Sequence, residues 1–106
     1  MRMLLRAVLD TESGNEAIRN GSLPETIQKM VQQLNPEAAY FVSSEDGQRC
    51  CIAVFDMADP SQIPAVAEPL FQMAKARVTL SPCMNLEDLE KGFEELGSQM
   101  ASTEGT

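Results

Sequence analysis

The chain has 106 residues, of which 8 are basic, 16 are acidic and none is histidine, so its formal net charge at neutral pH is -8. The length fits one domain, and the hydrophobic fraction of 43% is typical of a globular chain and not of a disordered one. The acidity argues against nucleic acid or an anionic membrane as a partner, because both bind basic surfaces. The lack of histidine excludes Ser-His and Cys-His nucleophile pairs, histidine-ligated haem and most catalytic zinc arrangements.

The first third of the chain predicts a strand followed by a helix. Residues 3–9 alternate as a strand, and a short helical turn is expected around residues 15–19. Ser22 and Glu25 form the pattern of a capping box, which predicts the start of a helix. This helix is expected to end at Asn35, because the proline that follows disfavours helical geometry.

The middle of the chain predicts a hairpin and a second helix. Residues 38–43 and 48–55 are expected to be strands joined by a tight turn through Asp46-Gly47. Asp59 or Ser61 is expected to cap the next helix. The apolar stripe of this helix is expected to consist of Ile63, Val66, Ala67, Leu70, Phe71 and Ala74. Pro69, inside the helix, should kink it.

The last third predicts a fourth strand and a third helix. Residues 76–81 are expected to be the strand, and Asn85 with Asp88 begins a helix that carries Leu86, Leu89, Phe93 and Leu96 on one side. Its many acidic residues are expected to form a solvated face. Residues 98–106 are expected to be a flexible C-terminal tail, which leaves residues 1–97 as a single domain.

The order of these elements predicts an α+β fold. Strand, helix, strand, strand, helix and strand form the ferredoxin-like βαββαβ pattern with a four-stranded antiparallel sheet, here followed by an extra C-terminal helix. In that arrangement the third and fourth strands flank the first. Both helices of the repeat cover one face of the sheet, so the other face is left open.

Alternation predicts which side chains lie on the open face. Leu4, Arg6 and Val8 of the first strand should lie there, as should Arg77 and Thr79 of the fourth. For the second and third strands either face remains possible. The third strand is apolar on both sides, as expected for a strand that is buried twice. A homodimer that covers the open face is therefore expected.

Arg6, Arg77 and Thr79 are the first candidate binding residues. Together they are able to form an anion pocket inside such a dimer. The simpler alternative is that Arg6 pairs with an acidic side chain across the interface, or that Arg77 reaches water. Under either interpretation a buried guanidinium needs a partner.

The three cysteines predict packing and not chemistry. Cys50 and Cys51 are adjacent in a strand, so they point to opposite faces and cannot bind one ion together. Which of them faces the dimer interior is left open. Cys83 should lie about two strand spacings away, roughly 9–10 Å, which is beyond the reach of a disulfide. No metal site is expected, and free thiols without an export signal predict a cytoplasmic protein.

Asp56 and Asp59 are the remaining candidates for chemistry, because they bracket the end of the third strand. In the first interpretation they form a carboxylate pair that transfers a proton or binds a divalent ion. In the second, Asp59 caps a helix and Asp56 is a polar group at the end of a strand. We favour the second interpretation.

Six motifs carry a resemblance to a known family, and it extends from about residue 2 to residue 97. They are Asn15–Pro24, Pro36–Phe41, Val54–Met57, Asp59–Pro64, Ala67–Phe71 and Pro82–Leu89. On these residues the chain resembles a set of small bacterial proteins of unknown function in the dimeric α/β-barrel superfamily. That superfamily includes cofactor-independent monooxygenases, haem-degrading enzymes, lactone isomerases and ligand-sensing domains, so the fold alone does not select a function.

Two functions are consistent with the sequence. Several relatives rely on a histidine in the barrel, and its lack here disfavours haem degradation and histidine-based catalysis. The first function is a non-catalytic dimeric module that binds a small anionic or amphiphilic molecule, or serves in an interaction, with Arg6, Tyr40, Arg77 and Thr79 as ligand-binding residues. The alternative is a small cofactor-independent oxygenase or isomerase whose site lies between sheet and helices. Neither function requires a cofactor, and no catalytic residue is assigned.

Overall fold

The computed structural model describes residues 1–104, with side chains through residue 102. The elements in chain order are β1 (Arg2–Val8), α1 (Thr11–Arg19), α2 (Ser22–Leu34), β2 (Ala38–Ser43), β3 (Arg49–Asp56), the short 3₁₀ helix η1 (Pro60–Gln62), α3 (Ile63–Ala74), β4 (Arg77–Pro82) and α4 (Leu86–Glu104). The described chain is therefore an α+β protein with four α-helices and one four-stranded antiparallel sheet.

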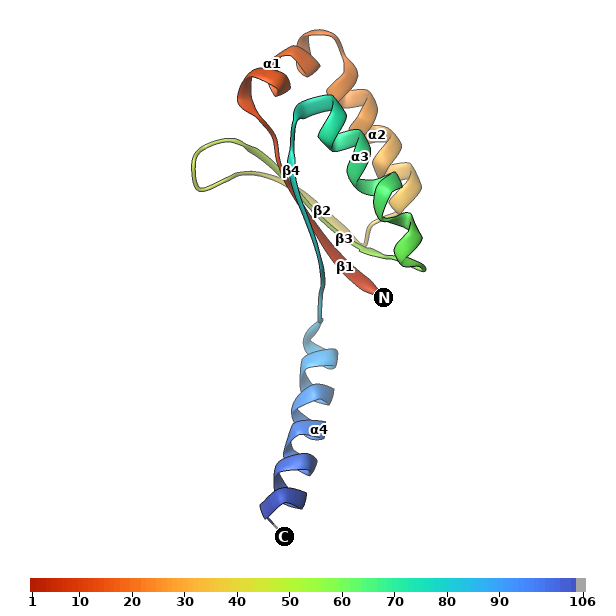
Figure 1. Ribbon diagram of the computed structural model, residues 1–106, viewed down its shortest axis with the longest axis vertical. Coiled ribbons are helices and arrows are strands. Elements are labelled where there is room, and N and C mark those ends of the chain that lie inside the picture. The colour runs from red at the N-terminus through yellow and green to blue at the C-terminus, as the bar shows by residue number, and fades with distance from the viewer. Residues whose placement is uncertain (105–106) are drawn as a thin grey trace.

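The strands lie in the order β2-β3-β1-β4, so β3 and β4 flank β1 as expected. This order is compatible with a ferredoxin-like arrangement. Helices α1, α2 and α3 lie on one side of the sheet, whereas α4 projects away from the end of β4 (Figure 1). The boundaries of all four strands agree with the predicted ranges to within one residue.

The core lies between the sheet and α1–α3. The face of β1 that carries Met3, Leu5 and Ala7 is buried against the helices, as the alternation predicted. Phe55, Leu5 and Leu70 are the largest fully buried side chains. Cys51 and Ala53 pack against the same core, which resolves the choice that the sequence left open for the third strand.

The opposite face of the sheet carries no helix, and its side chains form three rows across the strands. We call these twelve residues the open face. In the order β2, β3, β1, β4 the rows are Ala38, Val54, Leu4, Ser81; Tyr40, Ile52, Arg6, Thr79; and Val42, Cys50, Val8, Arg77.

The connection between α1 and α2 differs from the prediction. Instead of a short turn, α1 is a nine-residue helix, because the Asp10 side chain accepts a hydrogen bond from the Ser13 backbone N–H at 3.0 Å and caps it. The capping box predicted from Ser22 and Glu25 is wrong. Gly21 occupies the N-cap position of α2 with φ of 80°, because α1 ends only two residues before α2 begins. The Ser22 N–H is satisfied instead by the Asn20 side chain at 2.9 Å.

The start of α3 follows one of the two predicted alternatives. Asp59 caps η1 by accepting a hydrogen bond from the Ser61 backbone N–H at 2.9 Å, and the Gln62 side chain completes a capping box. Pro69 lies inside α3, which continues helical to Ala74. Two members of the predicted stripe, Ile63 and Phe71, are exposed.

Helix α4 is longer than expected and makes the molecule elongated. Asn85 and Asp88 exchange hydrogen bonds between side chain and backbone at its start, as predicted for its first turn. The helix then continues through residues 98–104, where we expected a flexible tail, and residues 105–106 lie outside the described part. Every residue from 86 to 102 is exposed. The radius of gyration is 17.9 Å, compared with about 13 Å for a compact domain of this length.

Candidate ligand-binding face

The structure places the four predicted binding residues on the open face. Arg6 lies directly opposite Thr79 on β4, and Tyr40 lies in the same row beyond Ile52. Arg6 and Tyr40 are thus two strand spacings apart, roughly 9–10 Å between backbones. Arg77 lies in the next row, opposite Val8.

Arg6 is the exceptional side chain of this face. It is half-buried at the centre of the sheet, where Leu4, Val8 and Ile52 surround it on the same face. Among the described residues its guanidinium makes no ion pair, and none of its side-chain nitrogens has a hydrogen-bond partner. The nearest polar contact is to its backbone, where the Thr79 hydroxyl donates to the Arg6 carbonyl oxygen at 3.5 Å. A cation held in apolar surroundings without a partner is unfavourable, so this arrangement favours an incoming anion.

An open pocket of about 460 Å³ lies over this part of the face. Its walls are Arg6, Val8, Arg77 and Thr79 from the sheet and Ser44, Glu45 and Asp46 from the turn between β2 and β3. The Arg77 guanidinium donates to the Gln48 side-chain oxygen at 3.4 Å, which holds it near the base of this turn. The pocket therefore contains two guanidinium groups and two carboxylates, none of which forms a salt bridge within it.

The turn residues were missed by sequence reasoning. Their acidity was visible, because Glu45-Asp46-Gly47 is the predicted hairpin turn. The direction in which the turn leans was not visible, because it depends on how β2 and β3 twist relative to β1 and β4.

Tyr40 does not join this pocket. Its side chain is 63% exposed, and it lies on the edge strand β2. Tyr40 and Arg6 therefore share a row but do not converge in one closed cavity of the single chain.

Strand β2 is unusual because it exposes apolar side chains on both faces. Tyr40 and Val42 are 63% and 46% exposed on the open face, and Phe41 between them is 61% exposed on the helix side. An edge strand with these properties presents unpaired backbone groups together with apolar surface. Such a strand is typical of an interface.

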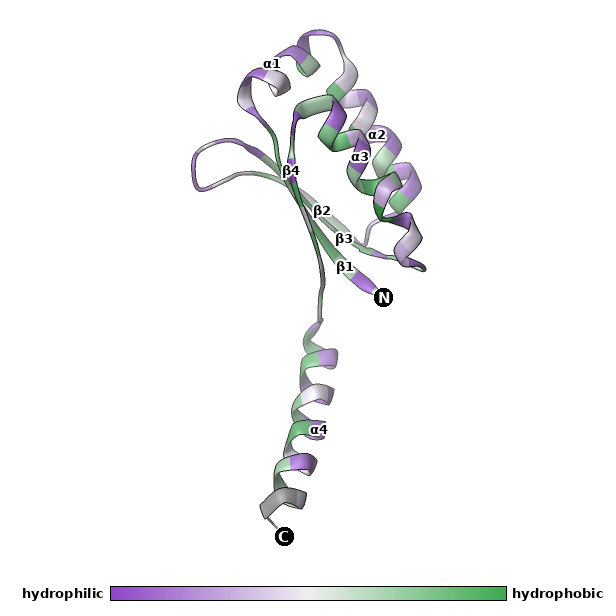
Figure 2. Cartoon of the chain, in the orientation of Figure 1, coloured by the Kyte–Doolittle hydropathy of each residue, from purple (hydrophilic) through white to green (hydrophobic). Residues whose placement is uncertain are grey.

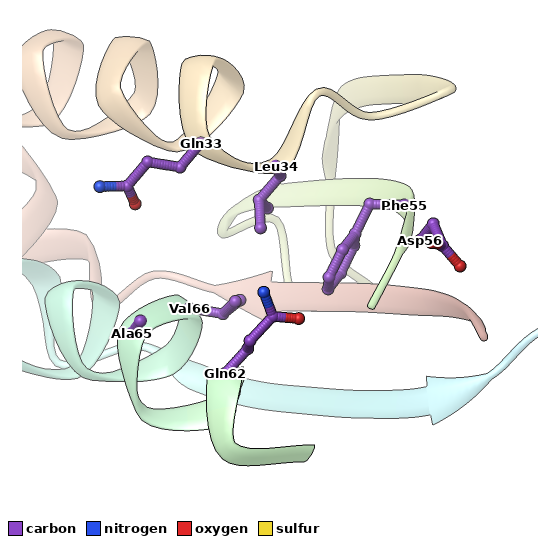
Figure 3. Close-up of a pocket in the computed structure, with 7 residues that line it drawn as sticks. All are labelled: Gln33, Leu34, Phe55, Asp56, Gln62, Ala65 and Val66. Atoms are coloured by element: carbon purple, nitrogen blue, oxygen red, sulfur yellow. The ribbon is translucent and has the colours of Figure 1, made fainter. Parts of the chain in front are cut away.

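A second cavity, of about 260 Å³, lies on the helix side between the C-terminal part of α2 and the start of α3 (Figure 3). The amide side chains of Gln33 and Gln62 extend into the gap, and Phe55 and Val66 supply apolar walls. The Asp56 carboxylate points away from the other six side chains. No acid and base face each other across this cavity, so its lining resembles a gap in helix packing more than a catalytic site.

Asp56, the last residue of β3, and Asp59 have separate structural roles, in agreement with the favoured interpretation. Asp56 accepts a hydrogen bond from the N-terminal amine at 2.8 Å. Asp59 caps η1, and the hydrogen bonds from Ser61 lower the pKa of its carboxyl below the ordinary value of 3.8. Within residues 1–104 no group of three metal-ligating side chains is close enough to hold an ion.

The cysteines lie on opposite faces, as the alternation required. Cys51 packs against the helix-side core and Cys50 lies on the open face, where it is nevertheless buried within the single chain. Burial raises the pKa of the Cys51 thiol. All three cysteines are free thiols.

Comparisons of the chain with protein-family models, with curated proteins and with solved structures return no match. In the described part of the chain, no helix has both the length and the apolar character needed to cross a bilayer.

Proposed function

We propose that this protein is a homodimeric, non-catalytic binding module of the dimeric α/β-barrel type, whose open face packs against a second copy and holds a small anionic or amphiphilic molecule. The observation that carries the proposal is Arg6, a half-buried guanidinium without a partner among the described residues, at the centre of a mostly apolar sheet face.

The apolar content of the open face supports the dimer. Eight of its twelve side chains are apolar or aromatic, namely Ala38, Tyr40, Val42, Cys50, Ile52, Val54, Leu4 and Val8. Cys50 and Val8 are buried within the single chain, and the other six are at least partly exposed. Exposed apolar side chains gathered on one sheet face favour an interaction surface. Tyr40 and Val42 of β2 are 63% and 46% exposed, so a second copy that covers this face buries surface that the single chain leaves in water.

Dimer formation makes the charge of Arg6 decisive. A guanidinium that becomes fully buried must gain a counter-charge, or the interface is strongly disfavoured. The exposed carboxylates of Glu45 and Asp46 are one source of that charge, and a small anion is the other. Arg6 and Arg77 present two forked donors to the pocket, a geometry that suits a carboxylate, phosphate or sulfonate group.

Binding is favoured over catalysis by the arrangement of the same residues. A cofactor-independent oxygenase or isomerase needs an acid or base that faces the bound substrate. Tyr40 lies outside the pocket, and the pocket carboxylates belong to an exposed turn. We therefore propose a binding role, with the oxygenase or isomerase as the alternative if the dimer brings Tyr40 of one copy to Arg6 of the other.

A charged and an uncharged form of one fluorescent probe test this proposal. Anilinonaphthalene sulfonate is an anionic amphiphile, and phenylnaphthylamine is its uncharged analogue. Arg6→Met keeps the length of the side chain and removes its charge. Because a hydrogen bond to a charged group contributes about 1.5–3 kcal/mol, we expect the affinity for the sulfonate to fall about tenfold or more. Affinity for the uncharged analogue should change less than about twofold.

The matched control is Arg19→Met, which removes an exposed guanidinium that contacts only Glu16, at 3.6 Å. This variant should bind both probes as the unmodified protein does. Equal sulfonate affinity in the Arg6→Met and unmodified proteins, measured by fluorescence titration, contradicts an anion site at Arg6.

A further inference from the structure

Helix α4 presents an apolar surface that no other described residue covers. Its large apolar residues are all at least one-third exposed, and Leu86 and Phe93 reach 70% and 61%. Bands of hydrophobic residues recur along the ribbon of this isolated helix (Figure 2). The connection to the rest of the molecule is at its first turn, where the Arg2 guanidinium contacts the Asp88 carboxylate at 2.9 Å.

The spacing of these residues is that of a coiled-coil seam. They follow one another at intervals of three, four, three and four residues, which assigns them alternately to positions a and d of a heptad: Leu86, Leu89, Phe93, Leu96 and Met100. The five residues therefore share one side of α4.

We propose that α4 pairs in parallel with α4 of a second copy, as a two-heptad coiled coil at the end of the proposed dimer. The inference rests on the proposed dimer for the following reason. Each seam residue buries on the order of 100 Å² of apolar surface, so the two helices together bury roughly 1,000 Å². Stable interfaces bury about 1,200–2,000 Å². The seam is therefore too small to hold two chains alone and pairs once the open faces bring two copies together.

The composition of α4 supports this occupant. Gly92 and Gly97 lie inside the helix, where they weaken a helix that stands alone in water. They occupy the g and e positions that flank the seam, so two such helices are able to approach closely. In parallel register Gly92 lies across from Gly97 of the other copy, and Asn85 lies across from Glu90, so neither pair sets two acids against each other.

The remaining acids of α4 do not oppose the pairing. Glu87, Asp88, Glu94 and Glu95 occupy the b and c positions, which point away from the seam into solvent. Their repulsion acts through water and is screened by salt. Added salt should therefore strengthen the pairing of the helices, whereas it weakens an association held by ion pairs.

Cysteine cross-linking tests the pairing and its direction. In a background in which Cys50, Cys51 and Cys83 are replaced by alanine, Leu89→Cys and Met100→Cys are each prepared alone. Parallel pairing places each introduced thiol next to the same thiol of the other copy. Each variant should therefore form a disulfide-linked dimer in high yield under mild oxidation. Ser98→Cys, at an outward f position, should not. Cross-linking only when Leu89→Cys and Met100→Cys are mixed means antiparallel pairing and overturns the parallel arrangement.

A second pair of variants separates this inference from the dimer itself. Leu96→Glu places a charge in the seam and Ser98→Glu places the same charge outside it, so only Leu96→Glu should abolish the Leu89→Cys cross-link. If the protein is a dimer in solution and no α4 cross-link forms, the coiled coil is excluded while the open-face dimer stands. If Tyr40→Glu abolishes the dimer but the cross-link persists at the same yield, α4 pairs without the open face and the dependence inferred here is wrong.

Discussion

Arg6 and the two adjacent cysteines show that a shift of one position in a strand moves a side chain to the other face of the sheet. Cys50 and Cys51 are neighbours in the chain, yet one faces the helices and the other faces the open side, because successive side chains of a strand point in opposite directions. The pair therefore does not form one shared site. Arg6 obeys the same alternation, which places its charge between Leu4 and Val8 on the open face.

The thiols should differ in reactivity. Cys51 is buried and its pKa is raised, so at mildly alkaline pH less of it is thiolate than of an ordinary cysteine. Cys50 is only 3% exposed, whereas Cys83 is more accessible at the end of β4. We expect iodoacetamide to label Cys83 first in the native protein, as measured by peptide mass spectrometry over time. In urea all three should react at similar rates, and equal native rates contradict the burial described here.

The helices show how a cap depends on what precedes it. The Ser22–Glu25 pattern is a correct local signal for a helix start, and α2 does begin at Ser22. The cap itself is different because α1 runs up to Arg19, and only a left-handed Gly21 turns the chain quickly enough between the two helices. Asp10 and Asp59, which follow extended segments, cap their helices through the ordinary side-chain bond.

The cap of η1 predicts a pH effect. Hydrogen bonds from Ser61 lower the folded-state pKa of Asp59 below 3.8, so the stabilisation is present above that ordinary value and is lost as the pH falls through the folded-state pKa. Asp59→Asn keeps an acceptor oxygen but does not titrate. We expect its denaturant midpoint to fall less between pH 5 and pH 2 than that of the unmodified protein. Glu68→Gln, at an exposed site on α3, should leave the acid dependence unchanged, and identical curves for all three proteins contradict the role of Asp59.

The shape of the chain supports the proposed dimer. A radius of gyration of 17.9 Å, the apolar open face and the isolated α4 all leave surface in water that a single copy does not cover. Two copies joined through the open face, with the α4 helices paired beyond it, cover both surfaces.

Tyr40 and Phe41 allow a matched test of which face is the interface. They are adjacent on β2 and almost equally exposed, at 63% and 61%, but Tyr40 lies on the open face and Phe41 on the helix side. We expect the unmodified protein to have twice its chain mass of 11.6 kDa at micromolar concentration, as measured by light scattering. Tyr40→Glu should reduce this mass to that of one chain, and Phe41→Glu should leave it doubled. A single-chain mass for the unmodified protein contradicts the dimer, and dissociation by Phe41→Glu alone places the interface on the other face.

Much of the fold could be predicted, because the signals are local. Alternation in β1, the Asp-Gly turn and the apolar stripes of α2 and α3 each follow from a few neighbouring residues, and they sufficed for the order of the elements. The candidate residues Arg6, Arg77 and Thr79 were placed on one face by the same reasoning. The apolar side of α4 from Leu86 to Leu96 was also predicted. Its extension to Met100 was not, because the residues between Leu96 and Met100 are not apolar.

The residues alone decided which side chains share a face of a strand, because the two-residue period of a strand is a property of the backbone. Only the tertiary structure decided that Cys51, Ala53 and Phe55 meet the helices and that Cys50, Ile52 and Val54 do not. That choice depends on the register between β1 and β3, and a shift by one residue reverses it for the whole strand. The same long-range pairing places the Glu45-Asp46 turn beside Arg6 in one pocket. The residues next to Arg6 in the sequence do not indicate this contact.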